Sequence, residues 1–209
     1  MIYPVLTISK VNKSKFVDFW AEFYYFPVNR NTTEEDYNSL ISKNEFDIND
    51  IEKLFNWKNN MPIIVRGEDG QEIKKHPTKS IFLDKIRPEI PTINKLKKDF
   101  DIDVFNSSFK ASTKASTIWK IFLLHIIAPL KFPIFDQHVY RAYYFLERGN
   151  LVGFIELEKI SNAKKMKMYE DEYIPYFKDF NNELLKDRKS DKALWAFGKF
   201  LKNYPSLFK

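Results

Sequence analysis

The carboxylate of Asp136 is the first candidate for chemistry in this sequence. It follows an apolar run, residues 132–135, and precedes the segment QHVYRAYYFLERG, in which apolar residues recur at helical spacing until Gly149. An aspartate at this position can cap a helix, because its side chain accepts hydrogen bonds from backbone N–H groups of the first turn. If the carboxylate also faces a cleft, it can stabilise positive charge or help to activate a nucleophile. From the sequence, both roles are open.

The residues before Asp136 place this carboxylate at the end of a basic stretch. Between residues 104 and 135 the chain has no acidic residue but four lysines: Lys110, Lys114, Lys120 and Lys131. Burial beside the apolar run raises the pKa of an aspartate, whereas lysines and helix amides lower it. The sequence alone does not rank these opposing effects.

The composition excludes several classes of site. The chain has no cysteine, so it forms no disulfide and no thiolate metal site. Its three histidines, His76, His125 and His138, are far apart and form no HExxH motif, so no metal site is expected. The five glycines form no phosphate-binding loop, and no spacing singles out a nucleophilic serine. We expect no cofactor.

The hydropathy pattern indicates a folded protein, and its net charge is compatible with binding of a polyanion. The formal net charge is +6, from 34 basic and 28 acidic residues, which permits such a partner without requiring one. The N-terminal sequence MIYPVLTISK has no signal-peptide pattern, and the most apolar run, residues 118–130, is too short to span a bilayer. We therefore expect a cytoplasmic protein with no membrane segment. For the oligomeric state we favour a monomer.

Helical periodicity dominates the chain, and we predict an all-α fold. Helices are expected over residues 14–26, 33–42, 47–57, 78–86, 92–100, 117–128, 137–148, 165–185 and 190–203. Two short strands, 63–66 and 71–74, are expected to form a β-hairpin around a polar loop. Pro88 and Pro91 are expected to break the helical pattern. His125 lies in an apolar helix and is expected to be a core histidine, and Trp119, Tyr140 and Tyr144 are expected to pack against other side chains.

The middle of the chain resembles a known family. The segment KASTKASTIWKIFLLHIIAPLKFPIFDQHVYRA combines a polar turn with a lysine, an apolar helix, a short extended segment and the pattern Asp-x-His-Val-x-Arg. This order resembles the signature of the helix-hairpin-helix-GPD superfamily of DNA glycosylases, over residues 104–146. The resemblance implies that Asp136 is the catalytic carboxylate and that Lys114 corresponds to the nucleophilic lysine of bifunctional members. It also implies that His138 and Arg141 contact the substrate or DNA. The alternative for His138 is that it is simply solvated, and the alternative for Arg141 is a salt bridge with an acidic residue of a neighbouring helix.

The hairpin turn departs from the family pattern. Where the family has a Gly-rich turn that grips a DNA phosphate, this chain has NSSFKASTK. Hydroxyl groups and amides of Ser112 and Thr113 and the charges of Lys110 and Lys114 would then contact a phosphate, and Lys131 is a further candidate for DNA contact.

The fold that the resemblance implies has two helical lobes with Asp136 in the cleft between them. Within one unit, 1–209, one lobe would comprise residues 30–130, and the other residues 1–29 and 131–209. The implied function is excision of a damaged or mispaired base that is flipped out of DNA. A catalytically inactive nucleic-acid-binding relative and a helical protein of unrelated function are the alternatives.

Overall fold

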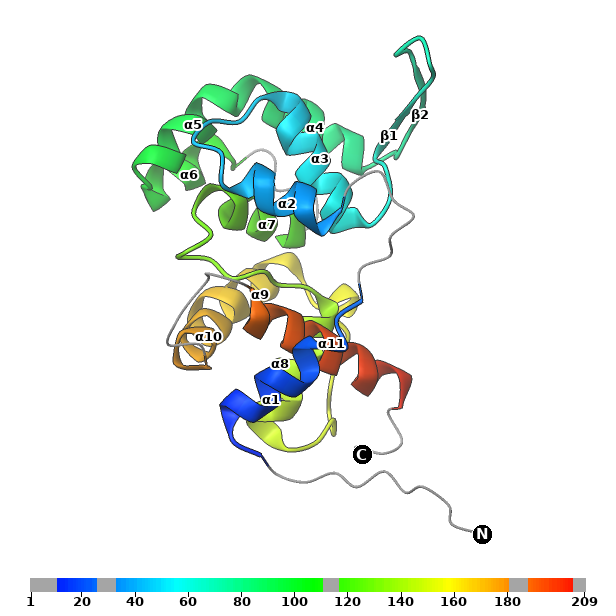
Figure 1. Cartoon of the computed structure of the whole chain (residues 1–209). Helices are drawn as coiled ribbons and strands as arrows, with labels where there is room; N and C mark the ends of the chain where they lie inside the picture. The colour runs from blue at the N-terminus through cyan, green and yellow to red at the C-terminus, as the bar shows by residue number, and fades with distance from the viewer. Residues whose placement is uncertain (1–10, 26–32, 111–116, 181–187, 205–209) are drawn as a thin grey trace.

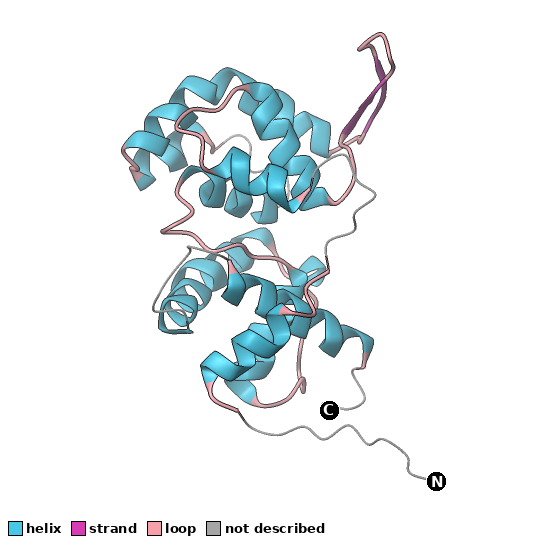
Figure 2. Ribbon diagram, viewed as in Figure 1, coloured by secondary structure: helices cyan, strands magenta, loops and turns pink. Residues whose placement is uncertain are grey.

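Helices make up most of the protein, and a short antiparallel hairpin is the one sheet among the described residues (Figure 2). The computed structural model describes residues 11–25, 33–110, 117–180 and 188–204. The prediction of a mainly helical chain with a hairpin near residues 63–74 is confirmed. Within the described ranges, no helix is long and apolar enough to cross a membrane.

The elements follow one another in a simple order. The helices of the first half are α1 (Lys13–Ala21), α2 (Glu34–Ile41), α3 (Ile48–Asn59), α4 (Lys79–Ile86), η1 (Arg87–Glu89), α5 (Ile90–Lys98) and α6 (Ile102–Ser108). The hairpin strands are β1 (Ile64–Arg66) and β2 (Glu72–Lys75). The second half contains α7 (Thr117–Ile127), α8 (Gln137–Arg148), η3 (Leu157–Lys159), α9 (Asn162–Lys167), η4 (Met168–Tyr173), α10 (Ile174–Phe180) and α11 (Lys189–Asn203).

Two groups of helices are visible in Figure 1. Helices α2 to α7 and the hairpin form the upper group, and α1 together with α8 to α11 forms the lower group. Helix α11, near the C-terminus, packs against both α8 and α1, so the two ends of the chain meet in the lower group. The expected lobes, 30–130 and 1–29 plus 131–209, stay a prediction as domain boundaries.

Local sequence signals set the start of several helices. Thr33 and Asp36 form a capping box at α2, and Asp47 and Asp50 form another at α3. Each cap satisfies backbone N–H groups that have no partner within the helix, which contributes about 1 kcal/mol. At α8, Asp136 is the N-cap, and Gly149 ends the helix in the left-handed conformation at φ 73°.

The core is rich in aromatic side chains. Tyr37 of α2 stacks on Trp57 of α3 with ring centroids 4.2 Å apart. His125 of α7 is buried, as predicted, and its ring nitrogens lie 2.5 Å from the Tyr37 hydroxyl and 2.7 Å from the Phe132 carbonyl oxygen. Burial lowers the pKa of His125 to about 3, so this histidine is neutral in the folded protein. Trp119, Tyr140 and Tyr144 are also buried, which confirms their predicted packing role.

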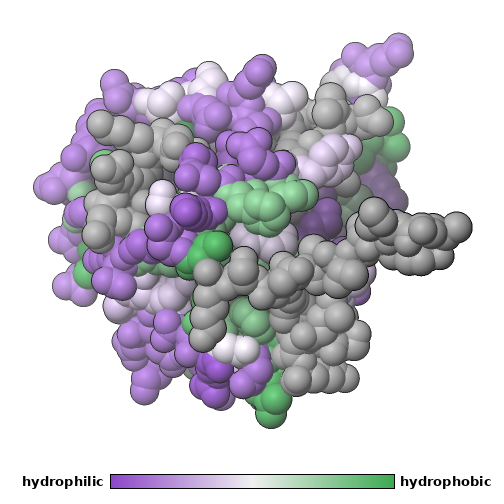
Figure 3. All heavy atoms as spheres, turned by 60° about the horizontal axis from the view of Figure 1, so that its bottom comes forward, coloured by the Kyte–Doolittle hydropathy of each residue, from purple (hydrophilic) through white to green (hydrophobic). Residues whose placement is uncertain are grey.

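The surface is mostly hydrophilic on the face drawn in Figure 3, with small apolar areas between the polar ones. Several large apolar side chains near the end of α1 are exposed, including Phe19, Phe23 and Tyr25.

Several expected element boundaries are wrong. The first helix ends at Ala21 and not at residue 26. The break expected at Pro88 and Pro91 is present, because α4 ends at Ile86 and each proline lies in the first turn of a new element (η1 or α5), where the missing N–H has no helical partner to lose. Helix α6 was not expected. The helix predicted over 165–185 is divided, within its described part, into α9, the π-helical η4 and α10.

Helices α8 and α11 approach each other closely at Gly198. A Cβ atom placed on Gly198 would lie 1.8 Å from the backbone oxygen of His138. Only a residue without a side chain fits there. This contact brings the N-terminal turn of α8, with Asp136 before it, against the middle of α11.

Candidate functional site

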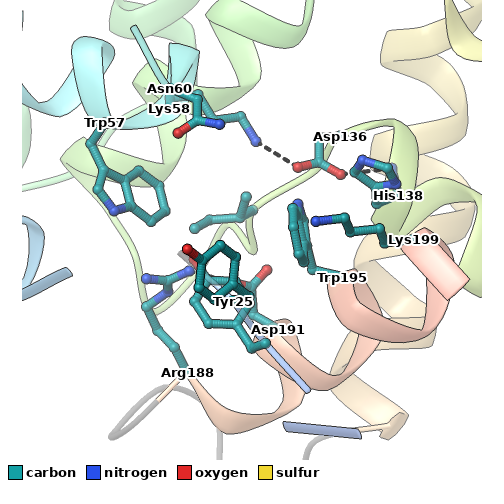
Figure 4. Close-up of a pocket in the computed structure, with 12 residues that line it drawn as sticks. Tyr25, Trp57, Lys58, Asn60, Asp136, His138, Arg188, Asp191, Trp195 and Lys199 are labelled. Atoms are coloured by element: carbon teal, nitrogen blue, oxygen red, sulfur yellow. Dashed lines mark hydrogen bonds and ion pairs between the residues drawn. The ribbon is translucent and has the colours of Figure 1, made fainter. Parts of the chain in front are cut away.

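A cavity of about 370 Å³ lies where α3, α8, α11 and the end of the α1 region meet (Figure 4). Its volume is at the lower end of the range typical of small-molecule sites. The lining residues are Tyr24, Tyr25, Trp57, Lys58, Asn60, Ile134, Asp136, His138, Arg188, Asp191, Trp195 and Lys199.

The two oxygens of Asp136 have different roles. Oδ1 accepts hydrogen bonds from the backbone N–H groups of His138, at 2.8 Å, and Val139, at 3.0 Å. This oxygen caps α8. Oδ2 lies 3.2 Å from Nζ of Lys58, on the cavity side of the carboxylate. The side chain of Asp136 retains 22% of its exposed area, so it is capped and still open to the cavity.

The surroundings of Asp136 favour its charged form. Burial opposes ionisation, but the charge of Lys58, the neighbouring His138 ring when it is protonated and the Val139 amide outweigh it, and the pKa of Asp136 lies below its ordinary value. Lys58 comes from the last turn of α3, and its side chain is only 10% exposed. A buried ammonium group beside a capped carboxylate fixes the negative charge at the cavity wall near neutral pH.

Aromatic rings form part of the cavity wall. Trp57 of α3 and Trp195 of α11 approach the cavity from different helices. His138 packs against Trp195 with its ring centroid 5.1 Å away in an edge-to-face arrangement. Burial lowers the pKa of His138, although Asp136 opposes this effect, so the imidazole is mainly neutral at pH 7.

A second ion-paired group lies at the start of α11. Nη2 of Arg188 lies 2.7 Å from Oδ2 of Asp191, and Nη1 of Arg188 bonds to Glu34. The Arg188 guanidinium also lies over the rings of Tyr37 and Trp57, at 4.5 and 4.7 Å from their centroids. Burial raises the pKa of Asp191, although Arg188 opposes this effect. The cavity therefore holds two carboxylates whose pKa values are displaced in opposite directions.

The structure brings together only part of the predicted site. Asp136 and His138 line the cavity. His138 is half-buried, so substrate contact and solvation both stay open for it. Arg141 does not line the cavity. It is buried, bonds to both carboxylate oxygens of Glu156 at 2.7 Å, and donates to the Gly198 carbonyl oxygen at 3.3 Å. The salt bridge, its alternative role, is present, and nothing in this position supports contact with DNA.

The predicted basic and hydroxyl residues lie elsewhere. Lys131 is exposed, and its ammonium group lies 5.2 Å from the ring of Phe100, away from the cavity lining. Lys110 is exposed just after α6. Ser112, Thr113 and Lys114 lie outside the described residues, so their predicted roles stay predictions.

The sequence did not point to four of the residues that shape the cavity: Lys58, Arg188, Asp191 and Trp195. Each lies in a helix, or next to one, whose pattern is explained by packing alone, and Lys58 is separated from Asp136 by 78 positions. The one local signal is that Asp191 falls in the first turn of α11, a common place for an acidic residue.

Among the described residues, no group of three or more His, Asp or Glu side chains is arranged to hold a metal ion. Comparisons of the chain with protein-family models, with curated proteins and with solved structures found no match.

Proposed function

We propose that this protein cleaves the N-glycosidic bond of a nucleobase in DNA, with Asp136 as the catalytic carboxylate. The observation that carries the proposal is the position of Asp136 Oδ2. This oxygen faces a base-sized cavity, next to Lys58, while Oδ1 is held by two backbone amides of α8. An aspartate that acted only as a cap would not need an open cavity at its second oxygen.

The chemistry follows from a fixed negative charge. When the bond between C1′ and the base breaks, its electron pair leaves with the base, and positive charge develops on the sugar ring. An ionised carboxylate near C1′ stabilises that charge. A water molecule then adds to C1′ and loses a proton, and the departed base takes up a proton, so that the products are a free base and an abasic sugar. The lowered pKa of Asp136 supports this role, because the carboxylate is already charged before the reaction begins.

The cavity walls are compatible with a flipped base. Enzymes that act on bases in a duplex rotate the base out of the stack into a pocket lined by apolar and aromatic side chains. Trp57, Trp195 and Ile134 supply such surfaces here. The lining also contains three cationic side chains, Lys58, Arg188 and Lys199, against two carboxylates, and this net positive charge suits a polyanionic substrate.

The experiment is single-turnover base excision from duplexes that each contain one altered base, among them uracil, hypoxanthine and oxidised guanine. We expect the wild-type chain to release at least one of these bases. Asp136→Asn keeps the shape of the side chain and a competent helix cap, but removes the charge, so excision should fall by about 100-fold or more.

Asp101→Asn is a matched control. Asp101 caps α6 in the same way, accepting from the N–H groups of Asp103 at 2.8 Å and Val104 at 3.1 Å, and it does not line the cavity. Its substitution should leave the excision rate unchanged. If no base is released from any duplex while the chain binds DNA in a salt-dependent manner, the alternative of a non-cleaving DNA-binding protein is correct.

A further inference from the structure

Unpaired polar atoms are concentrated at the cavity. Four buried side-chain atoms in the described part of the chain lack a hydrogen-bond partner, and three belong to lining residues: Asn60 Oδ1, Arg188 Nε and Asp191 Oδ1. Buried polar atoms in folded proteins are nearly always paired, because an unpaired atom loses its hydration without compensation. The side chains of Arg188 and Asp191 are only 9% and 8% exposed. A ligand that enters the cavity and displaces the groups covering these atoms would supply the missing partners.

Arg188 and Asp191 present a fixed donor beside a fixed acceptor. The 2.7 Å bond between Arg188 Nη2 and Asp191 Oδ2 holds the two side chains together, and Glu34 bonds to the remaining terminal nitrogen, Nη1. Nε of Arg188 and Oδ1 of Asp191 are then left over from this network. In Figure 4 both side chains lie at one side of the cavity, with Lys58 and Asn60 at the other.

We propose that the cavity selects a nucleobase with a lactam edge, that is, a ring N–H next to a ring carbonyl group. Asp191 Oδ1 accepts a hydrogen bond from the ring N–H, and Arg188 Nε donates one to the carbonyl oxygen. This inference rests on the proposed function and names its substrate class: guanine, hypoxanthine, uracil, thymine and their derivatives. Asn60 Oδ1 remains as an acceptor for a further N–H of the base.

Electrostatics distinguish the lactam edge from the amidine edge of adenine and cytosine. Both edges carry a donor and an acceptor, so counting hydrogen bonds does not separate them. A carbonyl oxygen has two lone pairs and more negative charge than a ring nitrogen, which suits the guanidinium of Arg188. The lactam N–H is more acidic than an exocyclic amino group, which suits the carboxylate of Asp191. A charged acceptor beside a charged donor therefore favours the more polar lactam.

The first test changes the ligand and leaves the protein intact. Binding of inosine and uridine is compared with binding of 1-methylinosine and 3-methyluridine, in which a methyl group replaces the ring N–H. Saturation-transfer NMR detects the weak binding expected of free nucleosides. Loss of one hydrogen bond to a charged group should weaken binding by about tenfold or more. Adenosine and cytidine should bind as weakly as the methylated probes.

The second test changes the protein. Asp191→Asn should reduce the preference for inosine over 1-methylinosine to about twofold or less, because the charged acceptor is lost. Asp18→Asn is the matched control. Asp18 is a carboxylate of the same helical group, is paired with Lys189, is 58% exposed and does not line the cavity. The Asp18→Asn protein should therefore keep the wild-type preference for inosine over 1-methylinosine.

The outcomes separate this inference from the proposed function. A wild-type chain that prefers lactam nucleosides but releases no base from any duplex retains the inference and refutes the glycosylase activity. A chain that releases bases but binds methylated and unmethylated nucleosides equally, or binds no nucleoside, refutes the inference. Since the ligand comparison uses the wild-type protein, it decides the matter even if Asp191→Asn fails to fold.

Discussion

Replacing Gly198 by alanine should separate α8 from α11 and disturb the cavity. The new Cβ would lie 1.8 Å from the His138 oxygen, whereas an ordinary contact needs 3.4 Å, so the contact is about 1.6 Å too short. The obstacle is the backbone of α8, and no side-chain rotation can relieve it. The two helices must therefore move apart.

The expected sign of the stability change is opposite to that of an ordinary helix substitution. Glycine to alanine within a helix normally stabilises by about 1 kcal/mol. Overpacking costs about 1–3 kcal/mol, and a clash with rigid backbone belongs at the upper end of that range or above it. We expect Gly198→Ala to lower the free energy of unfolding by about 2 kcal/mol or more, measured by urea denaturation.

The same displacement should affect the site. Helix α11 carries Asp191, Trp195 and Lys199, while Asp136 caps α8, so separation of these helices changes the spacing across the cavity. Misplacement by about 1 Å can reduce a rate by about 100-fold. Ala196→Gly in the same helix is the control, because it lowers helix propensity without forcing the helices apart. A Gly198→Ala chain as stable and active as the wild type would refute the close contact.

Two further predictions concern protonation. Since burial lowers the pKa of His125 from 6.5 to about 3, the unfolded chain takes up a proton between these values that the folded chain does not. The contribution of this group should therefore lower the free energy of unfolding by roughly 3 kcal/mol as the pH falls from 7 to 4. If His125→Gln shows the same pH dependence as the wild type, His125 is not its cause. Lys58→Met removes the cation 3.2 Å from Asp136, so burial is offset less strongly and the pKa of Asp136 rises. The acidic limb of the excision pH profile should move to higher pH, whereas Lys43→Met, which removes the partner of Asp50, should leave it in place.

The sequence determined the local features of this protein. It gave most helices, the hairpin, the capping role of Asp136 and the burial of His125, because these depend on residues within one or two turns of each other. Helix ends were less predictable, as at Ala21 and in the segment that begins at Asn162 and is divided into α9, η4 and α10. The end of α4 at Ile86 was predictable from the prolines that follow it, because proline is tolerated in a first helical turn but not in a helix interior.

Only the tertiary structure decided the composition of the cavity. Lys58 and Asp136 are 78 positions apart, and Arg188 bonds to Glu34 across 154 positions. No periodicity within one helix relates such residues, because their contact depends on how α3, α8 and α11 pack. The same packing buries Arg141 against Glu156, while Asp136 stays open on its second oxygen. Helix packing thus determines that Arg141 of α8 only supports the fold, whereas Asp136, the N-cap of the same helix, also faces the cavity.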